Sequence, residues 1–280
     1  MKKKFLSFIL AICLIIPCAL IMTACGGDPP PPSEPTHNYE NGVCVDCGDV
    51  KGLQFEYVTS SDSYKVLDGR QVIASKFSIP ATYDDGEHGE KPVTVIGASA
   101  FYDCGVITEV TIPSSIKVIE NNAFEECKSL ARANMVEGLE SIGNCAFMNC
   151  RSLDCVGIPS SVTTLGTEIF ADCLMLLNIT FDAPITEITQ WMFRDCCNMD
   201  YFLVPETVTR ISSYAFSNCA KLEEVVISNT IEEIADYAFA DCGYLEEVFF
   251  IGTAQEWEDL KSYIGEGNDF LLNARMVFAA

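Results

Sequence analysis

The sequence predicts an α/β fold: a solenoid of 23-residue repeats with short parallel strands and short helical turns, capped at both ends. Two observations predict it. Phenylalanine occurs seven times at a fixed interval of 23 residues, and a cysteine follows three residues after each. An interval of this length, kept without insertions, indicates stacked coils that share one core. The phenylalanines are Phe101, Phe124, Phe147, Phe170, Phe193, Phe216 and Phe239.

Each repeat also predicts one short strand. In the first repeat Val110 and Ile112 are two residues apart, and later repeats carry apolar residues at both places. Side chains two apart lie on one face of a strand, so this face should be buried and the stacked strands should form a parallel sheet. Pro113 follows the strand and ends it, because proline cannot donate to a ladder. Ile116 and Ile119 begin two more columns that should point inward.

The cysteines of the repeat form a column that we expect to consist of buried free thiols. Stacked side chains at one repeat position run parallel and about 4.8 Å apart, whereas a disulfide needs Cβ atoms about 3.8 Å apart and not parallel. Their odd number also prevents complete pairing within the column. The column is Cys104, Cys127, Cys150, Cys173, Cys196, Cys219 and Cys242.

The repeat consensus can be written Leu-x-x-Val-x-Ile-Pro-x-x-Val-x-x-Ile-x-x-x-Ala-Phe-x-x-Cys. It resembles the BspA-type leucine-rich repeat family over residues 93–250, which hold seven repeats. The resemblance implies a right-handed, gently curved leucine-rich repeat solenoid of the kind carried by bacterial surface proteins and linked to adhesion or recognition.

Residues 53–92 are expected to form an N-terminal cap over the open end of the core, as solenoids require. This segment alternates in the manner of strands, and Asp68-Gly69 predicts a hairpin turn between two of them. The polar segment 84–91 predicts a loop inserted before the first full repeat.

Residues 251–280 are expected to form the C-terminal cap, because the 23-residue interval stops there. Thr253 should act as the N-cap of an amphipathic helix that turns Trp257 and Leu260 toward the core. Residues 274–279 predict a last strand.

The chain begins with a predicted bacterial lipoprotein signal peptide, residues 1–24, in which a basic start precedes an apolar run. Cys25 follows two small residues and resembles the lipidated cysteine of such signals. Residues 25–36 would then be the lipid anchor and a proline-rich linker. The alternatives are an ordinary secretory signal and an uncleaved anchor. The lipoprotein hypothesis predicts an extracytoplasmic protein, lipid-anchored to the bacterial cell membrane or cell surface.

Residues 37–52 form a small His/Cys element that suggests a zinc site. Cys44 and Cys47 have the spacing of two adjacent corners of a tetrahedron, and His37 could supply a third ligand. The alternatives are a Cys44–Cys47 disulfide and an element without a role. Apart from this possible zinc, no cofactor is expected.

The charge balance is strongly acidic, with 17 Lys+Arg against 40 Asp+Glu and a formal net charge of −23. Such a field repels nucleic acid, so we expect no polynucleotide partner. The two histidines lie outside the array, and neither a nucleophile with a base nor a phosphate loop is present. The sequence therefore predicts a protein that is not an enzyme, and an enzyme would need a site that the repeat pattern hides.

Recognition is the predicted function, through the outward face of the repeat sheet. Six residues of the last strands form a predicted binding patch, four of them uncharged and two acidic at its rim. They are Tyr201, Leu203, Val226 and Phe249, with Glu224 and Glu247. An exposed patch of this kind marks an interaction site. The expected partner is an extracellular protein or glycan, with the membrane contacted through the lipid anchor.

Two alternatives stay open for this face. Strands favour such residues in any case, and the C-terminal cap could cover Phe249. A zinc-binding N-terminal module with the array as a spacer or scaffold is the alternative function.

Overall fold

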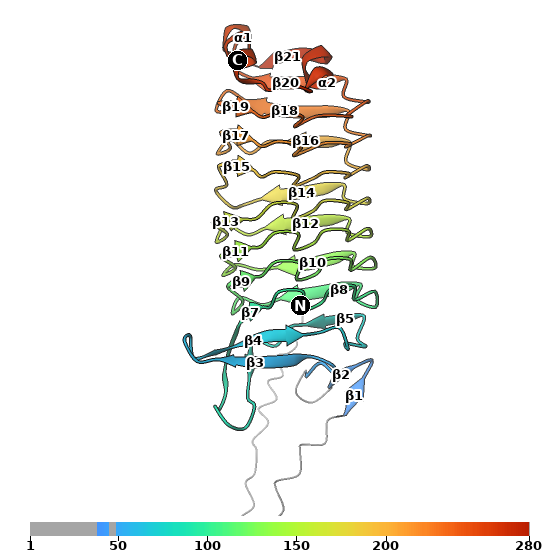
Figure 1. The fold of residues 1–280 in the computed structure, drawn as a ribbon, viewed down its shortest axis with the longest axis vertical. Coiled ribbons are helices and arrows are strands. Elements are labelled where there is room, and N and C mark those ends of the chain that lie inside the picture. Colours follow the sequence, from blue (N-terminus) through green and yellow to red (C-terminus); the bar gives the residue numbers. More distant parts are fainter. Residues whose placement is uncertain (1–37, 45–48, 280) are drawn as a thin grey trace, which may run out of the picture. The chain divides into compact units, whose positions relative to one another are not determined.

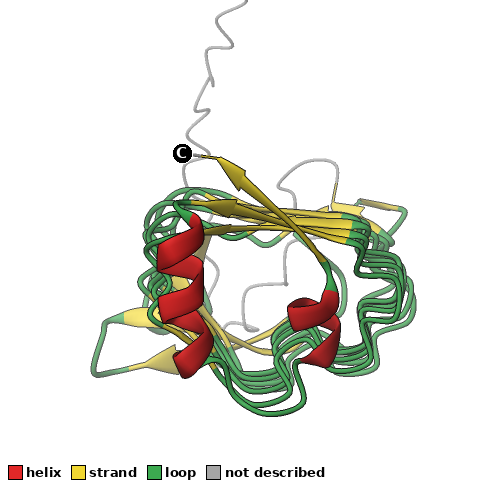
Figure 2. Cartoon of the chain, turned by 90° about the horizontal axis from the view of Figure 1, so that it is seen from above, coloured by secondary structure: helices red, strands yellow, loops and turns green. Residues whose placement is uncertain are grey.

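Successive 23-residue coils stack in register in the computed structural model of the protein, and the expected solenoid class is confirmed (Figure 1). The structure describes residues 38–44 and 49–279. Viewed along the stack, the coils superimpose around a common interior, with two helices lying across one end (Figure 2).

The longer strand of each coil lies in a parallel ladder whose register is offset by one repeat, as in Val110 opposite Ala133. The ladder has a break, because β8 to β14 belong to one sheet and β16 to β20 to another. The predicted parallel strands are therefore confirmed, but they form two sheets. The strands along this side are β5 (Lys76–Ser78), β8 (Glu109–Ile112), β10 (Arg132–Met135), β12 (Cys155–Ile158), β14 (Asn178–Phe181), β16 (Tyr201–Leu203), β18 (Glu224–Ser228), β20 (Glu247–Ile251) and β21 (Arg275–Ala279).

A second set of strands, two residues each, follows the first set in each coil. Their ladders are parallel as well, and they break between β13 and β15. Their last residues are the inward column that begins with Ile119, and most of these side chains are buried. The short strands are β9 (Val118–Ile119), β11 (Ser141–Ile142), β13 (Thr164–Leu165), β15 (Glu187–Ile188), β17 (Arg210–Ile211) and β19 (Glu233–Ile234).

The Ala-Phe-x-x-Cys segments, where short helical turns were predicted, are single turns that close on themselves, as from the N–H of Cys127 to Phe124 O at 3.2 Å, but do not continue into a regular helix. Two residues of each turn have left-handed backbone, as Asn122 (φ 61°) and Glu126 (φ 63°) show. The N–H of Phe124 donates to the carbonyl of Ala146 in the next coil, at 2.8 Å. A regular helix would direct every such donor back along its own segment, whereas here only alternate donors do so, as from Glu125 to Asn122 O at 3.1 Å, and the others bond to the next coil. The helices of the described residues are α1 (Ala254–Leu260), η1 (Lys261–Tyr263) and α2 (Asp269–Asn273).

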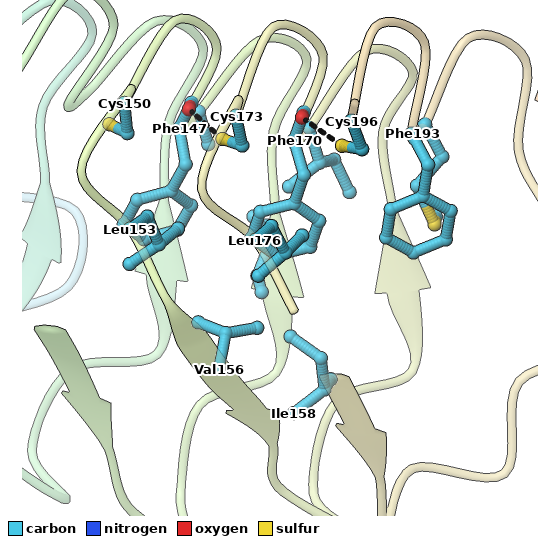
Figure 3. Packing of buried hydrophobic residues seen from close by; sticks show 14 of the residues in the cluster. Phe147, Cys150, Leu153, Val156, Ile158, Phe170, Cys173, Leu176, Phe193 and Cys196 are labelled. Carbon is cyan, nitrogen blue, oxygen red and sulfur yellow. Dashed lines mark hydrogen bonds between the residues drawn. The ribbon is translucent and has the colours of Figure 1, made fainter. Parts of the chain in front are cut away.

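The core is built from columns of equivalent side chains, and two of these columns consist of a single residue type, phenylalanine or cysteine. The phenylalanine rings stack with centroids 4.8 Å apart at Phe101–Phe124 and 6.0 Å apart at Phe170–Phe193. The predicted cysteine column is buried, and its members are free thiols. From Cys127 onward each thiol donates to the phenylalanine carbonyl of the preceding coil, as from Cys173 Sγ to Phe147 O at 3.2 Å (Figure 3), whereas Cys104 donates to the carbonyl of Gly69. The thiols therefore tie neighbouring coils together, a contact that repeat spacing alone did not predict.

The N-terminal end is closed by a hairpin of β3 (Gln54–Val58) and β4 (Ser63–Asp68), with β4 parallel to β7 (Lys91–Ile96). The hairpin turn lies between β3 and β4, so its prediction at Asp68-Gly69 was wrong. Gly69 instead lies against the ring of Phe101, where a Cβ would come 2.1 Å from Cε1. This close approach, rather than a turn, explains the glycine. The remaining strands here are β1 (Tyr39–Glu40), β2 (Val43–Cys44) and β6 (Thr82–Tyr83).

The C-terminal end is closed by α1, η1 and α2. Thr253 is the N-cap of α1 and forms a capping box with Glu256, which confirms the predicted helix start. Trp257 and Leu260 are buried against the core, also as predicted. The expected last strand is β21, which runs parallel to β20.

Candidate functional site

The outward face of the second sheet brings the six residues of the predicted patch together. In the register of β16, β18 and β20, two rows run across the strands. One row is apolar and the other is mostly acidic, so the face has an apolar stripe beside a charged stripe. The apolar row is Leu203, Val226 and Phe249, and the second row is Tyr201, Glu224 and Glu247.

The side chains of the patch are more exposed in β16 than in β20. Tyr201 and Leu203 are 44% and 53% exposed, which is high for large side chains in a strand. Val226 and Phe249 are half-buried. The C-terminal cap therefore leaves part of Phe249 open to solvent, and the apolar row is accessible along its whole length.

The last strand extends both rows by one residue, which repeat spacing did not predict because the interval stops before it. Val277 of β21 lies beside Phe249, and Arg275 lies beside Glu247 and forms an ion pair with it. Glu224 in β18 is exposed. The acidic row is therefore partly neutralised at the end of the stack, and Glu224 is its accessible carboxylate.

This arrangement can bind but offers little for catalysis. The patch carries two carboxylates in neighbouring strands, and the described residues that form it include no histidine, cysteine or lysine to serve as a partner base or nucleophile. Apolar area beside a carboxylate suits a ligand surface with apolar groups flanked by positive charge.

The residues of the predicted zinc site are only partly described. His37 and Cys47 lie outside the described residues, whereas Cys44 is a buried residue of β2. Within residues 38–44 and 49–279, no group of three His, Cys, Asp or Glu side chains could hold a metal ion. The zinc site stays a prediction.

The predicted leader, the lipidated Cys25 and the linker also lie outside the described residues. In the part of the chain that the structure describes, no helix is both long and apolar enough to cross a membrane.

Comparison with known proteins identifies the repeat. The model of the BspA type leucine rich repeat region matches residues 94–222 and 192–261, with six copies. No curated protein sequence matches the chain.

Solved structures with the same kind of fold come from several bacteria. A leucine-rich repeat protein of T. pallidum is 25% identical and has a TM-score of 0.51, over 82% of this chain and 97% of that chain. One from Bacteroides ovatus is 21% identical with a TM-score of 0.49, over 78% of this chain and 67% of that chain. The family model covers more than half of the sequence, so the chain belongs to the BspA-type leucine-rich repeat family.

Proposed function

We propose that this protein is a non-enzymatic recognition protein of the bacterial surface that binds an extracellular protein through the patch on β16, β18 and β20. The observation that carries the proposal is the unbroken apolar row of Leu203, Val226 and Phe249, open to solvent on a sheet face. Leucine-rich repeat arrays offer broad sheet faces of this kind, which suit extended partners.

A protein partner fits this patch better than a glycan. The row of three apolar side chains supplies no hydrogen-bond donor or acceptor, whereas a glycan presents hydroxyl groups that need such partners. Tyr201 adds a large ring with a polar tip, a residue type enriched at the energetic centres of protein interfaces. Glu224 at the rim favours a partner with a basic side chain there.

The proposed location rests on the leader and on Cys25. Cleavage before Cys25 and diacylation would anchor the chain, and the proline-rich linker would hold the array away from the membrane. A net charge of −23 suits a protein that stays clear of an anionic bilayer surface.

The proposal is tested by surface plasmon resonance of the purified full chain against a panel of extracellular matrix proteins. The Leu203→Ser variant removes the most exposed side chain of the apolar row. Loss of such a contact should weaken binding to the captured matrix protein about tenfold or more.

A matched control is available in the same fold. Leu67 lies in β4 of the N-terminal cap and is 48% exposed, so Leu67→Ser makes the same chemical change away from the patch. We expect it to bind as the unaltered protein does. Equal affinities of the Leu203→Ser protein and the unaltered protein would contradict the proposal, as would binding to glycans alone.

A further inference from the structure

A depression of about 310 Å³ lies on the outward face of the first sheet, over β10, β12 and β14. It is separate from the apolar patch, which lies on the strands beyond the break between the two sheets. It is lined mostly by polar residues, together with Ala133 and Val156, whose side chains are buried in the core. The outward-facing lining residues are Arg132, Asn134, Cys155, Gly157, Asn178 and Thr180.

The fold itself does not require glycine at position 157. A Cβ built there would meet Thr180 Oγ1 at 3.2 Å and no other atom within 4 Å. At Gly143, by contrast, a Cβ would come within 2.8 Å of three atoms. Glycine weakens the interior of a strand, and it recurs there where a bulge, a bend or the close approach of a ligand needs the space.

The ladder around Gly157 shows no bulge on the side of β14. Gly157 lies opposite Thr180 within four consecutive pairs between β12 and β14. On the side of β10, the described register pairs Arg132 with Cys155 alone. The missing side chain therefore opens the depression at a place where the contact between β10 and β12 is already loose.

The wall of the depression holds a cation without a carboxylate partner. Arg132 is exposed and forms no ion pair with any carboxylate of the described residues. The nearest carboxylate in its row is Glu109, which already binds Lys76 at 3.3 Å and accepts from Asn134 at 3.1 Å. Arg132 is the one charged side chain among the described residues that line the depression, although the whole chain is strongly acidic.

We infer that the depression at Gly157 binds an acidic monosaccharide unit, a six-membered sugar ring that carries a carboxylate. The guanidinium of Arg132 matches the carboxylate in a two-point contact. The side-chain amides of Asn134 and Asn178 and the hydroxyl of Thr180 match ring hydroxyls, which both donate and accept. The space left by the missing side chain of Gly157 accommodates the C–H face of the ring.

An acidic peptide side chain would use less of this site. A carboxylate on a flexible chain needs Arg132 but leaves the amides and the space at Gly157 unused. The volume lies at the lower end of the range for small-molecule pockets, which suits one sugar unit. A single unit of this size in an open depression should bind with a Kd on the order of 1 mM.

The test uses saturation-transfer NMR titrations of the purified full chain with D-glucuronate, D-glucose and acetate as probes. We expect saturable binding of glucuronate, with glucose and acetate each bound at least about tenfold more weakly. The Gly157→Val variant should abolish glucuronate binding and raise Tm, because valine fills the depression and favours the strand. The rise in Tm shows that the lost binding does not come from unfolding.

A second variant keeps the inference testable if valine does not fit. Arg132→Gln keeps most of the side chain's length and removes its charge, and it should weaken glucuronate binding about tenfold. The Leu203→Ser variant of the apolar patch should leave glucuronate binding unchanged, so failure of the proposed function and failure of this site are distinguishable.

Several results would overturn the inference. Glucose bound as tightly as glucuronate would remove the role of the carboxylate, and acetate bound as tightly would remove the role of the ring. Unchanged glucuronate binding in both variants would move the site elsewhere. An acidic peptide that binds in place of all three probes would make this half of the face a protein-binding surface.

Discussion

The side-chain oxygen of Asn121 occupies the space where any residue other than glycine at position 143 would carry its Cβ. Oδ1 of Asn121 would lie 2.6 Å from that atom. The same oxygen accepts a hydrogen bond of 2.9 Å from the N–H of Asn144, which follows Gly143 in the next coil. The side chain of Asn121 and the glycine at position 143 therefore depend on each other, because the hydrogen bond from Asn144 to Asn121 needs the space that a side chain at position 143 would fill.

The same pairing of a polar side chain with a glycine in the next coil recurs elsewhere in the stack. Asn144 lies over Gly166 in the same way and accepts from Thr167 N at 2.9 Å. Near the C-terminal cap, Asp236 lies over Gly265 and accepts at 3.0 Å from the N–H of the following residue. These glycines are explained by the neighbouring coil, in contrast to Gly157.

We expect Gly143→Ala to destabilise the protein by about 1 to 3 kcal/mol, because the new Cβ meets backbone atoms of the preceding coil as well as Oδ1 of Asn121. The matched control is Gly157→Ala, where a Cβ meets only Thr180 Oγ1, at 3.2 Å, and alanine loses less conformational entropy on folding than glycine. This control should gain about 0.5 to 1 kcal/mol. Urea denaturation of the three proteins measures both changes, and equal effects of the two substitutions would contradict this account of the glycines.

The buried cysteine column predicts loss of stability at alkaline pH. Burial raises the pKa of Cys127 and Cys242 to about 12, against an ordinary value of 9.0. It also raises the pKa of Cys196 well above that value. Thiols in the unfolded chain ionise near pH 9 while the folded ones stay protonated. The stabilisation is therefore complete below pH 9 and is lost as the pH rises toward 12, by about 1.4 kcal/mol per pH unit for each thiol.

Urea midpoints between pH 8 and pH 11 measure this slope, and Cys196→Ala isolates one thiol. The stability of the variant should fall less steeply with pH than that of the unaltered protein, and the difference in slope is the contribution of one thiol. It should also be less stable at pH 8 by about 1 kcal/mol, since Cys196 donates to the carbonyl of Phe170. Identical slopes for the two proteins would show that other groups cause the alkaline loss.

A charge cluster lies near the point where the sheets break, and it predicts a salt-dependent variant. Arg194 is 3.7 Å from Glu168, 2.9 Å from Asp172 and 3.2 Å from Asp195. Arg194→Met leaves three carboxylates without their shared cation, so we expect a loss of about 1 to 3 kcal/mol. Added salt should reduce this loss, because it screens the repulsion.

The control for the cluster is Lys261→Met, which removes one partner of an exposed pair with Glu258. Such a pair contributes less than about 1 kcal/mol. Thermal unfolding at low and high salt compares the two variants. A loss at Arg194 no greater than that at Lys261 would show that the cluster does not hold the coils together at the break.

The lipoprotein hypothesis predicts the fate of a Cys25→Ser variant. Without the thiol that accepts the lipid, the protein should leave the membrane fraction or keep its leader. Fractionation of expressing bacteria and the intact mass of the extracted protein measure this, with Cys155→Ser as the control because Cys155 is exposed on the sheet face. Membrane retention of a processed Cys25→Ser protein would contradict lipid anchoring at this residue.

Much of the fold could be predicted because each coil places equivalent residues in equivalent surroundings. The columns of Phe101 and Cys104 indicated the buried interior, and the last strands indicated a patch with the order that the register shows. The C-terminal helix start was readable because the capping box of Thr253 and Glu256 is a local contact.

The errors arose where one coil decides the conformation of another. Asp68-Gly69 has the composition of a hairpin turn, but Gly69 is set by the ring of Phe101, more than thirty positions later. The Ala-Phe-x-x-Cys segments have the residue spacing of a helical turn. The hydrogen bonds that some of their N–H groups make to the next coil cannot be inferred from that spacing.

The sequence by itself determined the repeat, the solenoid class, the buried columns and the face on which the apolar patch lies. These follow from periodicity, because a side chain's position in a coil fixes the side to which it points. Only the tertiary structure decided where the sheets break, which carbonyls the thiols contact, and which glycines the neighbouring coil requires. Each of these depends on distances between atoms of different coils, and a repeat interval fixes the order of the coils but not the gap between them.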